Sequence, residues 1–267
     1  MLELLPINQG RIDEYSNLLT TVFNKSFFTK TYLHWQYFEN PNGAAVGYDV
    51  IYNGDLVAHY ACIPLELGVS RRKILLSLNT ATRKDFQGKG FFTRLAQKTF
   101  DDVSETFDFV VGVANENSVH GFTRKLGFEQ IGNLNLRYGP PTMVSVESHQ
   151  VYYSADTLTW RLKSERGGFS LTRSNSSLYV QKKISILGPN IWQPILSVDS
   201  RILTVPSTIQ RLPRACWSLD WSSQHTKENF FSLPKWIKPS PLHLIKLNLS
   251  STQKSLDYFS YLDFDAY

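Results

Sequence analysis

The sequence predicts an α/β protein. A mixed sheet flanked by helices is expected over residues 1–140, with a mostly β or irregular C-terminal part, residues 141–267, packed on it. Apolar residues of the first part alternate between the two-residue period of strands and the helical period of about 3.6. Twelve of the 15 glycines lie at or before Gly139, whereas five of the six tryptophans follow it. Pro140-Pro141 stands at this change and excludes a helix interior or a central strand, so we place the boundary near 140–147.

The first residues predict a strand, a helix and a hairpin. The strand covers Leu2–Ile7, and the segments Gly47–Tyr52 and Asp55–Ile63 form two more. Asn53-Gly54, between these two segments, is a strong signal for a two-residue hairpin turn. The helix after the first strand has apolar residues at helical spacing, namely Ile12, Tyr15, Leu19 and Val22. A second helix, which holds His34 and Trp35, is predicted before the hairpin.

The rest of the first part predicts, in order, a strand, a loop, a helix, a strand, a helix and a strand. These segments are Ile74–Thr82, Arg83–Gly90, Phe92–Val103, Asp108–Val113, Ser118–Leu126 and Phe128–Arg137. Both helices carry their apolar residues on one face, which indicates that each packs on a sheet. Periodicity is poorer in the C-terminal part, where four segments resemble strands: Ser170–Leu187, Ser197–Val205, Pro241–Leu249 and Tyr258–Phe264.

The composition is that of a globular protein, with 42% hydrophobic and 19% charged residues. Aromatic and β-branched residues run throughout, which excludes a wholly disordered chain. Apolar runs such as Phe107–Ala114 are far shorter than the roughly 20 residues that cross a bilayer, so we expect no membrane span. The N-terminus lacks the basic and apolar regions of a signal peptide. Two cysteines, Cys62 and Cys216, favour a reduced, cytoplasmic protein with both thiols in the core.

The charge is unevenly distributed. Residues 1–139 hold 14 Lys and Arg against 14 Asp and Glu, so the whole net charge of +5 lies in the C-terminal part. Such a surplus favours an anionic partner for that part, or simply a solvated basic surface. Its basic and aromatic residues do not interleave, so we expect no nucleic-acid partner. His225 and His243 have no His or Cys at metal-ligand spacing, so we expect no metal.

The segment Thr80–Thr93 is the most informative one for function, because a predicted strand ends, glycines follow and a helix begins. A helix N-terminus presents unpaired backbone N–H groups, and Gly88 and Gly90 would let a phosphate approach the backbone. Lys89 adds a positive charge. The pattern is neither a P-loop nor a dinucleotide fingerprint, which would need a glycine in place of Thr93. The alternative is an ordinary turn between a strand and a helix.

A second segment, after the next predicted strand, adds to this loop. Its Asn and Ser side chains suit the start of a helix, and Gly127 suits its end. Together the two segments resemble the GNAT acetyltransferase superfamily, over roughly residues 1–138. Gln87-x-x-Gly90 matches that family's Q/R-x-x-G-x-G/A signature. Asn115-x-Asn117-Ser118, with Leu126-Gly127-Phe128 at the helix end, is similar to its second cofactor motif.

The resemblance implies that acetyl-CoA or another acyl-CoA is a co-substrate, held in a cleft between the strands Ile74–Thr82 and Asp108–Val113. It implies backbone pairing with the pantetheine arm, N–H groups around the pyrophosphate, and a strand N–H near Thr80 at the thioester carbonyl. The cofactor-binding residues that it implies are Thr80, Ala81, Thr82, Gln87, Gly88, Lys89, Gly90, Phe91, Phe92, Thr93, Asn115 and Ser118.

Two positions depart from the family pattern. Phe92 stands where the signature ends in Gly or Ala, although the helix can still begin there because only its N–H is needed. The second helix of the family often carries a Tyr that protonates the leaving thiolate. Counting from Asn115 puts Phe122 at that position and counting back from Gly127 puts Thr123 there, and neither is an effective acid.

His59, Glu66 and Asp265 are the candidates for acid–base catalysis. His59 and Glu66 fall on opposite faces of a regular strand, unless Pro64 interrupts the alternation, and structural roles are the alternative for both. Asp265 shares a face with Asp263 if their segment is a strand. The alternative for this pair is an exposed acidic tail.

Trp160 and Arg161 are the candidates for contact with the acceptor, because a flat aromatic face suits stacking on a sugar or base. The alternative is that they pack the two parts of the chain together. The runs Asn40-Pro41-x-Gly43, Trp160-Arg161 and Asp263-Phe264-Asp265 are similar to those of GNAT-like enzymes from bacterial surface-sugar loci.

We therefore expect a cytoplasmic, acyl-CoA-dependent N-acyltransferase of the GNAT type. It would move an acetyl or other short acyl group to the primary amine of a small molecule by direct attack. The expected acceptor is an amino sugar, free or linked to a nucleotide, as in polysaccharide biosynthesis. The alternatives are an aminoacyl or peptide amine as acceptor, and a degenerate GNAT fold that binds acyl-CoA, or nothing, without catalysis.

Overall fold

The structure of the 267-residue chain is a computed structural model. The residues that it describes are 1–67, 71–139, 152–164, 168–174, 177–182, 191–195, 197–198, 208–209, 216–222, 231–232, 241–250, 254–256, 258–261 and 263–264.

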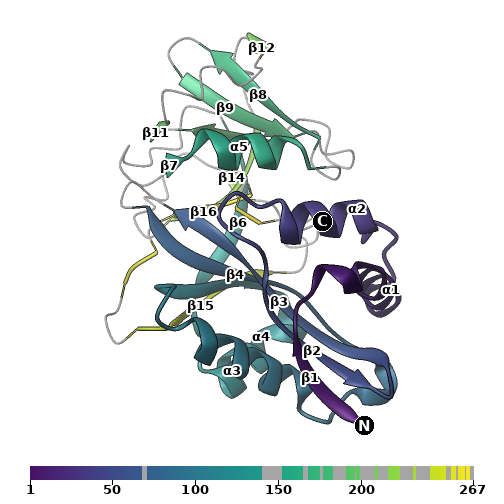
Figure 1. Cartoon of the computed structure of the whole chain (residues 1–267). Coiled ribbons are helices and arrows are strands. Elements are labelled where there is room, and N and C mark those ends of the chain that lie inside the picture. The colour runs from purple at the N-terminus through teal and green to yellow at the C-terminus, as the bar shows by residue number, and fades with distance from the viewer. Residues whose placement is uncertain are drawn as a thin grey trace.

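A mixed sheet of seven strands forms the body of the molecule (Figure 1). Neighbouring strands are antiparallel except β4 and β5, which are parallel. In their order across the sheet, the strands are β1 (Leu2–Pro6), β2 (Val46–Tyr52), β3 (Asp55–Leu67), β4 (Arg72–Thr82), β5 (Phe109–Ala114), β15 (Leu242–Asn248) and β6 (Glu129–Gly139). With the helices described next, this confirms the predicted fold class.

Two pairs of helices cover the two faces of the sheet. The first pair is α1 (Ile12–Phe23), which follows the short 3-10 helix η1 (Gln9–Arg11), and α2 (Lys30–Phe38). The second pair is α3 (Phe91–Val103) and α4 (Glu116–Leu126). No helix in the described part of the chain is both long enough and apolar enough to cross a membrane.

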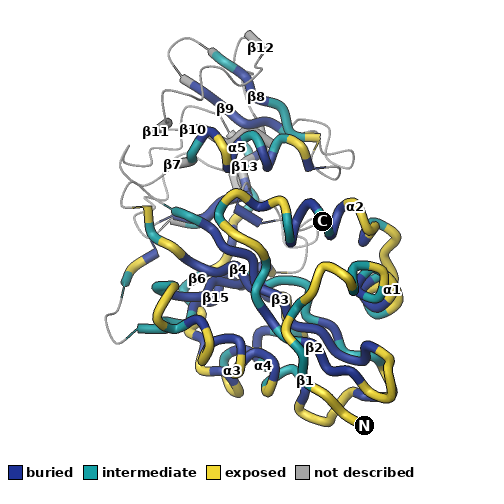
Figure 2. The backbone as a smooth tube through the Cα atoms, in the orientation of Figure 1, coloured by how far each residue is buried: buried dark blue, intermediate teal, exposed yellow. Residues whose placement is uncertain are grey.

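Strand β3 contributes to both cores because its side chains alternate between the faces. Ile63 and Leu65 pack with the residues of α1 and α2, whereas Tyr60 and Cys62 pack with those of α3 and α4. Figure 2 shows β3 buried along most of its length, and β4 is buried from Ile74 to Ser77. The core position that the sequence predicts for Cys62 is confirmed.

The hairpin between β2 and β3 turns at the predicted residues. Asn53 has φ +53° and Gly54 has φ +91°, so both central residues of the turn have positive φ. Two positive φ values are the requirement of the hairpin turn that suits the twist of the strands, and Asn-Gly meets it at little steric cost.

The strand predicted at 241–249 lies in the middle of the sheet rather than in a separate C-terminal unit. β15 pairs on one side with β5, with His243 opposite Ala114, and on the other side with β6, with Leu242 opposite Leu134. It thereby satisfies the backbone groups of two strands that would otherwise be sheet edges. The chain thus leaves the sheet after β6 and returns to it. The boundary predicted at 140–147 itself lies outside the described residues.

Further strands extend the sheet beyond β6. β13 (Cys216–Ser222) pairs with β6, and β10, β9, β8 and β12 follow outward. The segment predicted as one strand over 170–187 is described as two antiparallel strands that meet at Ser174 and Ser177. The helix α5 (Ala155–Leu162) was not predicted, although Ser154, a residue type that favours the N-cap position, caps it. The remaining bounds are β7 Tyr152–Tyr153, β8 Phe169–Ser174, β9 Ser177–Lys182, β10 Ile191–Ile195, β11 Ser197–Val198, β12 Thr208–Ile209, β14 Phe231–Ser232 and β16 Tyr258–Ser260.

Candidate active site

The two parallel strands of the sheet separate along their length. The pairing of β4 with β5 covers Leu75–Ser77 and Val110–Gly112 and stops there. β4 nevertheless continues to Thr82, and β5 continues to Ala114. The edge of β4 beyond Ser77 therefore turns backbone groups towards the gap between the strands, where an amide-containing chain could pair with them.

A bulge lies in β4 at the start of this gap. Leu78 is opposite Ala61 and Ala81 is opposite His59, so Asn79 and Thr80 together face one residue of β3. Asn79 has φ +50°, a conformation that Asn tolerates better than most residues. The extra residue shifts the alternation, so backbone groups near Thr80 are turned out of the regular ladder.

The loop after β4 ends in an open helix N-terminus. A 3-10 turn, η2 (Lys84–Phe86), leads to Gly88 and Gly90, whose φ values are +78° and +75°. Gly90 is the N-cap of α3 and supplies no side-chain hydrogen bond to its first turn. A Cβ built on either glycine would meet no atom within 4 Å. The glycines thus provide positive φ and leave open space, which is the geometry that an anion needs at a helix start.

The side chains of this loop hold its shape. Gln87 donates from Nε2 to the carbonyl oxygen of Thr82 at 3.2 Å. Phe91 is buried and stacks on Phe86, and the Lys89 Nζ lies 4.2 Å from the centre of the Phe86 ring. The side chain of Lys89 therefore runs beside the loop with its charge at the surface.

Asn115 and Ser118 form a reciprocal cap at the start of α4, directly after β5. The Asn115 Oδ1 accepts from the backbone N–H of Ser118 at 3.0 Å, and the Ser118 Oγ accepts from the N–H of Asn115 at 3.1 Å. Because β4 and β5 are parallel, this cap and the loop that starts α3 lie at the same end of the sheet. The two sequence motifs are therefore brought together.

Aromatic rings fill the space between α3 and α4. Phe92 meets Phe122 edge to face, with ring centres 5.0 Å apart, and Phe122 meets Phe128 in the same way at 5.1 Å. The helix begins at Phe91, so Phe92 does not prevent it from forming. Thr123 donates its hydroxyl to the carbonyl oxygen of Val119 at 2.9 Å. Of the two residues that could align with the Tyr of the family, Phe122 thus packs against other rings and Thr123 donates its hydroxyl within α4.

His59 is buried in the core on the α1–α2 side of the sheet, with 1% of its surface exposed. Its Nδ1 lies 2.7 Å from the Asp49 Oδ1, and its Nε2 lies 2.9 Å from the Tyr37 hydroxyl. The structure thus separates His59 from a direct approach by substrate. Tyr37 and Asp49 were not singled out from the sequence. They lie in α2 and β2, 22 and 10 residues from His59 in β3, and no local sequence pattern indicates contacts between such distant residues.

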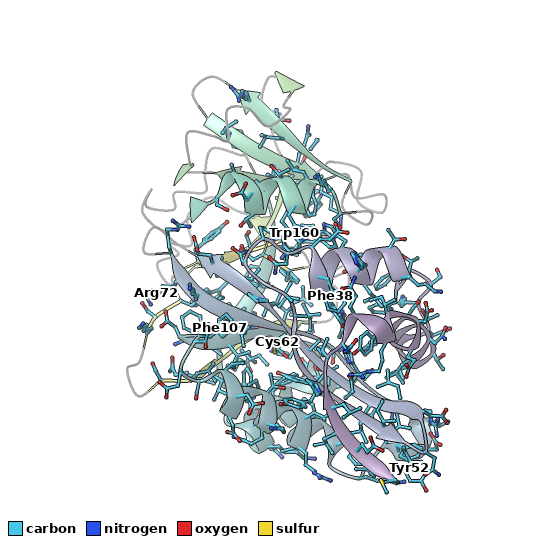
Figure 3. All side chains as sticks on the ribbon, viewed as in Figure 1. Phe38, Tyr52, Cys62, Arg72, Phe107 and Trp160 are labelled. Carbon is cyan, nitrogen blue, oxygen red and sulfur yellow. The ribbon has the colours of Figure 1, made fainter. Side chains whose placement is uncertain are left out.

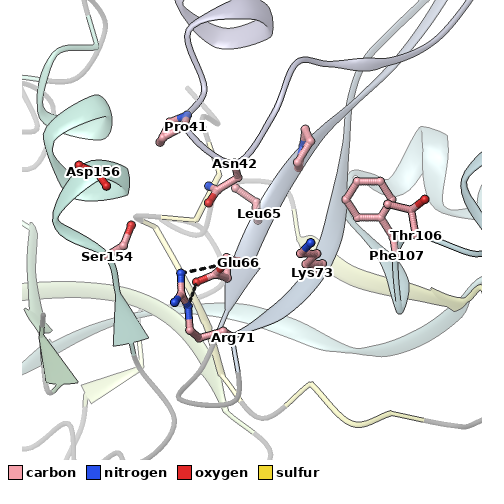
Figure 4. A pocket seen from close by; sticks show the side chains of 11 residues that line it. Pro41, Asn42, Leu65, Glu66, Arg71, Lys73, Thr106, Phe107, Ser154 and Asp156 are labelled. Carbon is pink, nitrogen blue, oxygen red and sulfur yellow. Dashed lines mark hydrogen bonds and ion pairs between the residues drawn. The ribbon is translucent and has the colours of Figure 1, made fainter.

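Glu66 lies on the opposite face of β3, as the alternation predicts, because Pro64 does not interrupt the strand. It pairs with Arg71, whose Nε is 2.5 Å from the Glu66 Oε1, in a cavity of about 340 Å³ that Lys73 and Asp156 also line (Figure 4). This cavity is beside the N-terminal end of β4, whereas the loop before α3 follows its C-terminal end. Asp265, the third catalytic candidate, lies outside the described residues.

Trp160 (labelled in Figure 3) and Arg161 are both buried residues of α5. The Trp160 ring stacks on that of Trp35 at 4.7 Å, and each indole N–H donates to the backbone carbonyl of the other residue at 3.0 Å. Arg161 has 1% of its surface exposed and donates to the carbonyl oxygen of Asp263 at 2.9 Å. Both side chains thus make packing contacts within the chain, which is the arrangement that the packing alternative expects.

His243 reaches the same end of the sheet through β15. Its Nε2 lies 3.2 Å from the Glu116 Oε1, and its Nδ1 lies 2.9 Å from both Gln130 and Asn133. The sequence suggested no such role, because this histidine is more than a hundred residues away from its partners. In the described residues, no group of three or more His, Cys, Asp or Glu side chains is arranged to hold a metal ion.

Comparison with known proteins agrees with this geometry. The family model described as "Acetyltransferase (GNAT) domain" matches residues 3–131. No curated protein matches the chain.

Several solved structures share the fold. A probable N-acyltransferase of Enterococcus faecalis V583 superposes with a TM-score of 0.62 at 10% identity, over 93% of this chain and 73% of its own. A candidate acetyltransferase of Pyrococcus horikoshii superposes with a TM-score of 0.54 at 10% identity, over 97% and 93% of the two chains. A GCN5-related N-acetyltransferase of Anabaena variabilis gives 0.50 at 13% identity, over 94% and 73%. Each of these three likenesses extends over at least 93% of this chain, so each includes most of the C-terminal part as well as residues 3–131.

Proposed function

We propose that this chain, whose residues 3–131 match the model of the GNAT acetyltransferase domain, transfers an acetyl or other short acyl group from acyl-CoA to the primary amine of a small molecule. The observation that carries this proposal is the gap between β4 and β5. It begins at a bulge and ends at a helix start that no side chain caps. A thioester with a long amide-containing arm and a diphosphate fits these features in that order.

In this proposal the free edge of β4 at Thr80, Ala81 and Thr82 pairs with the amides of the pantetheine arm. Backbone N–H groups from Gln87 to Thr93 hold the pyrophosphate at the N-terminus of α3, where the helix dipole is positive. A backbone N–H near Thr80 accommodates the charge that develops on the thioester oxygen during attack. Asn115 and Ser118 line the other side of the gap.

The amine nitrogen attacks the thioester carbon, the C–N bond forms, and the C–S bond breaks as the thiolate leaves. The nitrogen gives up one proton to water as the neutral amide forms. With Phe122 and Thr123 engaged elsewhere, the thiolate takes its proton from water. This is chemically reasonable because a thiol with a pKa of about 8.5 is a good leaving group near neutral pH.

For the acceptor we propose an amino sugar, free or linked to a nucleotide, used in polysaccharide biosynthesis in the cytoplasm. The positive net charge of the C-terminal part supports the nucleotide-linked form, because its diphosphate is anionic. An acyl-CoA-binding module without catalysis is the second candidate, and the presence of Phe92 and Phe122 at two motif positions favours it.

Thiol release from acetyl-CoA tests the proposal. The purified chain is incubated with an amino sugar, a nucleotide-linked amino sugar, a peptide with a free N-terminus, or no amine. We expect release that depends on an amine and is fastest with one of the sugars. A melting temperature that rises with acetyl-CoA, without release for any amine, would favour the binding module instead. No rise at millimolar acetyl-CoA would remove the cofactor assignment, because a ligand at about 100 times its Kd stabilises a protein by about 2.7 kcal/mol.

A further inference from the structure

A chain of buried hydrogen bonds connects α2, β3 and β2 to the bulge in β4. Asn79, at the bulge, donates from Nδ2 to the Tyr37 hydroxyl at 3.0 Å and to the Gln36 Oε1 at 2.7 Å. Tyr37 is 2.9 Å from the His59 Nε2, and His59 is 2.7 Å from Asp49. Tyr37, His59 and Asp49 are all buried, whereas Asn79 is partly exposed at the gap.

The donors of this chain all point the same way. A carboxylate only accepts, so the His59 Nδ1 carries a proton towards Asp49. Asn79 is itself a donor to Tyr37, so the Tyr37 hydroxyl donates to the His59 Nε2. The Tyr37 oxygen is then free to accept from Asn79. Burial raises the pKa of Tyr37 well above its ordinary value, which keeps the phenol protonated and able to donate. Each polar group along the line thus has a matched partner, the condition under which a buried network becomes rigid.

Asp49 anchors the far end of the chain. It is fully buried, and its Oδ2 accepts from the Tyr15 hydroxyl at 2.7 Å and from the Arg11 Nε at 3.0 Å. The Arg11 guanidinium supplies the positive charge that a buried carboxylate requires. This line of hydrogen bonds is therefore fixed at one end by α1 and β2, and at its other end it reaches Asn79 in β4.

We infer that Tyr37 and Asn79 are positioning residues: they hold the bulge of β4 in the conformation that turns a backbone N–H near Thr80 towards the thioester. The inference rests on the proposed function, in which that N–H stabilises the reacting carbonyl. Asn79 itself has φ +50°, and two bonds from its side chain to α2 fix its place. Small displacements of such a donor reduce the rate steeply, since its effect depends on geometry at the developing charge.

Tyr37→Phe and Tyr15→Phe form a matched pair that tests this inference. Each removes one hydroxyl from a fully buried ring next to the same network, but only the Tyr37 hydroxyl contacts Asn79. For Tyr37→Phe we expect kcat to fall about 10- to 100-fold while the KM for acyl-CoA stays within about twofold. Tyr15→Phe should lower the melting temperature by a similar amount and leave kcat nearly unchanged, because Arg11 still holds Asp49 in place. Asn79→Gly, which allows the positive φ but lacks the side chain, should behave as Tyr37→Phe does.

Amide hydrogen exchange at residues 79–81, measured without ligand, separates this inference from the proposed function. Faster exchange there in Tyr37→Phe than in Tyr15→Phe, together with the loss of kcat, supports the inference. Equal kcat in the two variants, or unchanged exchange at the bulge, overturns it. If the wild-type chain transfers no acyl group to any amine, the proposed function fails. In that case faster exchange in Tyr37→Phe alone still supports the anchoring of the bulge, and unchanged exchange still overturns it.

Discussion

Gly90 and Gly127 adopt almost the same backbone conformation at two different places. Their φ values are +75° and +73°, and a Cβ on either would meet no atom within 4 Å. Alanine at either position should therefore destabilise the fold by a similar amount, about 1–2 kcal/mol, because only the left-handed conformation is penalised. Gly90 caps the helix at the proposed pyrophosphate site, whereas Gly127 ends α4.

We predict that Gly90→Ala weakens acetyl-CoA binding and that Gly127→Ala does not. Gly90→Val should abolish the ligand-induced rise in melting temperature, since its branched side chain blocks the approach to the N–H groups. The measurement is the melting temperature of each variant with and without acetyl-CoA. Equal ligand shifts in Gly90→Ala and Gly127→Ala would mean that the loop is only a turn.

Cys62 should be unreactive in the folded protein. Burial raises the pKa of its thiol to about 12, and hydrogen bonds with Tyr60 and Ser77 only partly oppose this. An unfolded thiol loses its proton near pH 8.5, whereas the folded one keeps it until pH is near 12, so this group destabilises the fold as pH rises between those values. In a Cys216→Ser background, a thiol reagent at pH 8 should label Cys62 slowly without denaturant and rapidly in its presence. Fast labelling without denaturant would contradict this burial.

At the start of α4, a single residue, Asn115, has two roles. Asn115 caps the helix through Oδ1, and in the proposed function it also faces the pantetheine arm. We predict that Asn115→Ala lowers the free energy of unfolding by about 1 kcal/mol, whereas Asn115→Ser, which can still cap, leaves it nearly unchanged. Both variants should bind acetyl-CoA more weakly than the wild type does. If Asn115→Ser binds with wild-type affinity, the residue serves the helix alone.

The contact between α2 and α5 includes the stacked rings of Trp35 and Trp160. Trp160→Ala removes a buried ring that stacks on Trp35, so we expect a loss of about 3–5 kcal/mol in the free energy of unfolding. Trp160→Phe, which keeps an aromatic ring, should lose less. Kinetics below the melting temperature should show the KM values for acyl-CoA and acceptor changing alike. If Trp160→Ala instead raises the KM for the acceptor and leaves the melting temperature unchanged, Trp160 contacts the acceptor.

For the whole molecule, the decisive feature is the return of the chain into the sheet as β15. A truncated chain of residues 1–139 contains all of the residues that match the GNAT domain, but it lacks the strand between β5 and β6. We predict that it does not fold cooperatively, because both strands would expose unpaired backbone and apolar side chains. A matched variant joins Asn135 to Pro241 through an Asn-Gly turn and continues to Ser250. It restores β15 as a hairpin partner of β6, since Leu134 and Leu242 are already paired.

Urea unfolding followed by near-ultraviolet circular dichroism distinguishes the two variants. A sigmoidal transition for the joined variant, but not for residues 1–139, is the expected result. A cooperative transition for residues 1–139 would show that β15 is dispensable for the sheet.

Local patterns in the sequence determined the elements of the first part and the two segments that resemble the GNAT motifs. The Asn53-Gly54 turn, the glycines before α3 and the cap of α4 each depend on residues within a few positions of one another, so their φ values and hydrogen bonds follow from nearby residue types. The same locality explains why Phe92 and Phe122 stand out as departures from the two motifs in the sequence alone.

Only the tertiary structure decided which of these elements meet. The placement of β15 between β5 and β6, the stacking of Trp160 on Trp35 and the line from Asp49 to Asn79 join residues far apart in the chain. Such contacts are selected by the burial of whole faces and by the pairing of polar groups that burial would otherwise leave unsatisfied. The residues next to Trp160 or His59 in the sequence do not indicate which distant side chains these two will contact. The sequence therefore left a structural role and a role in the active site open for both.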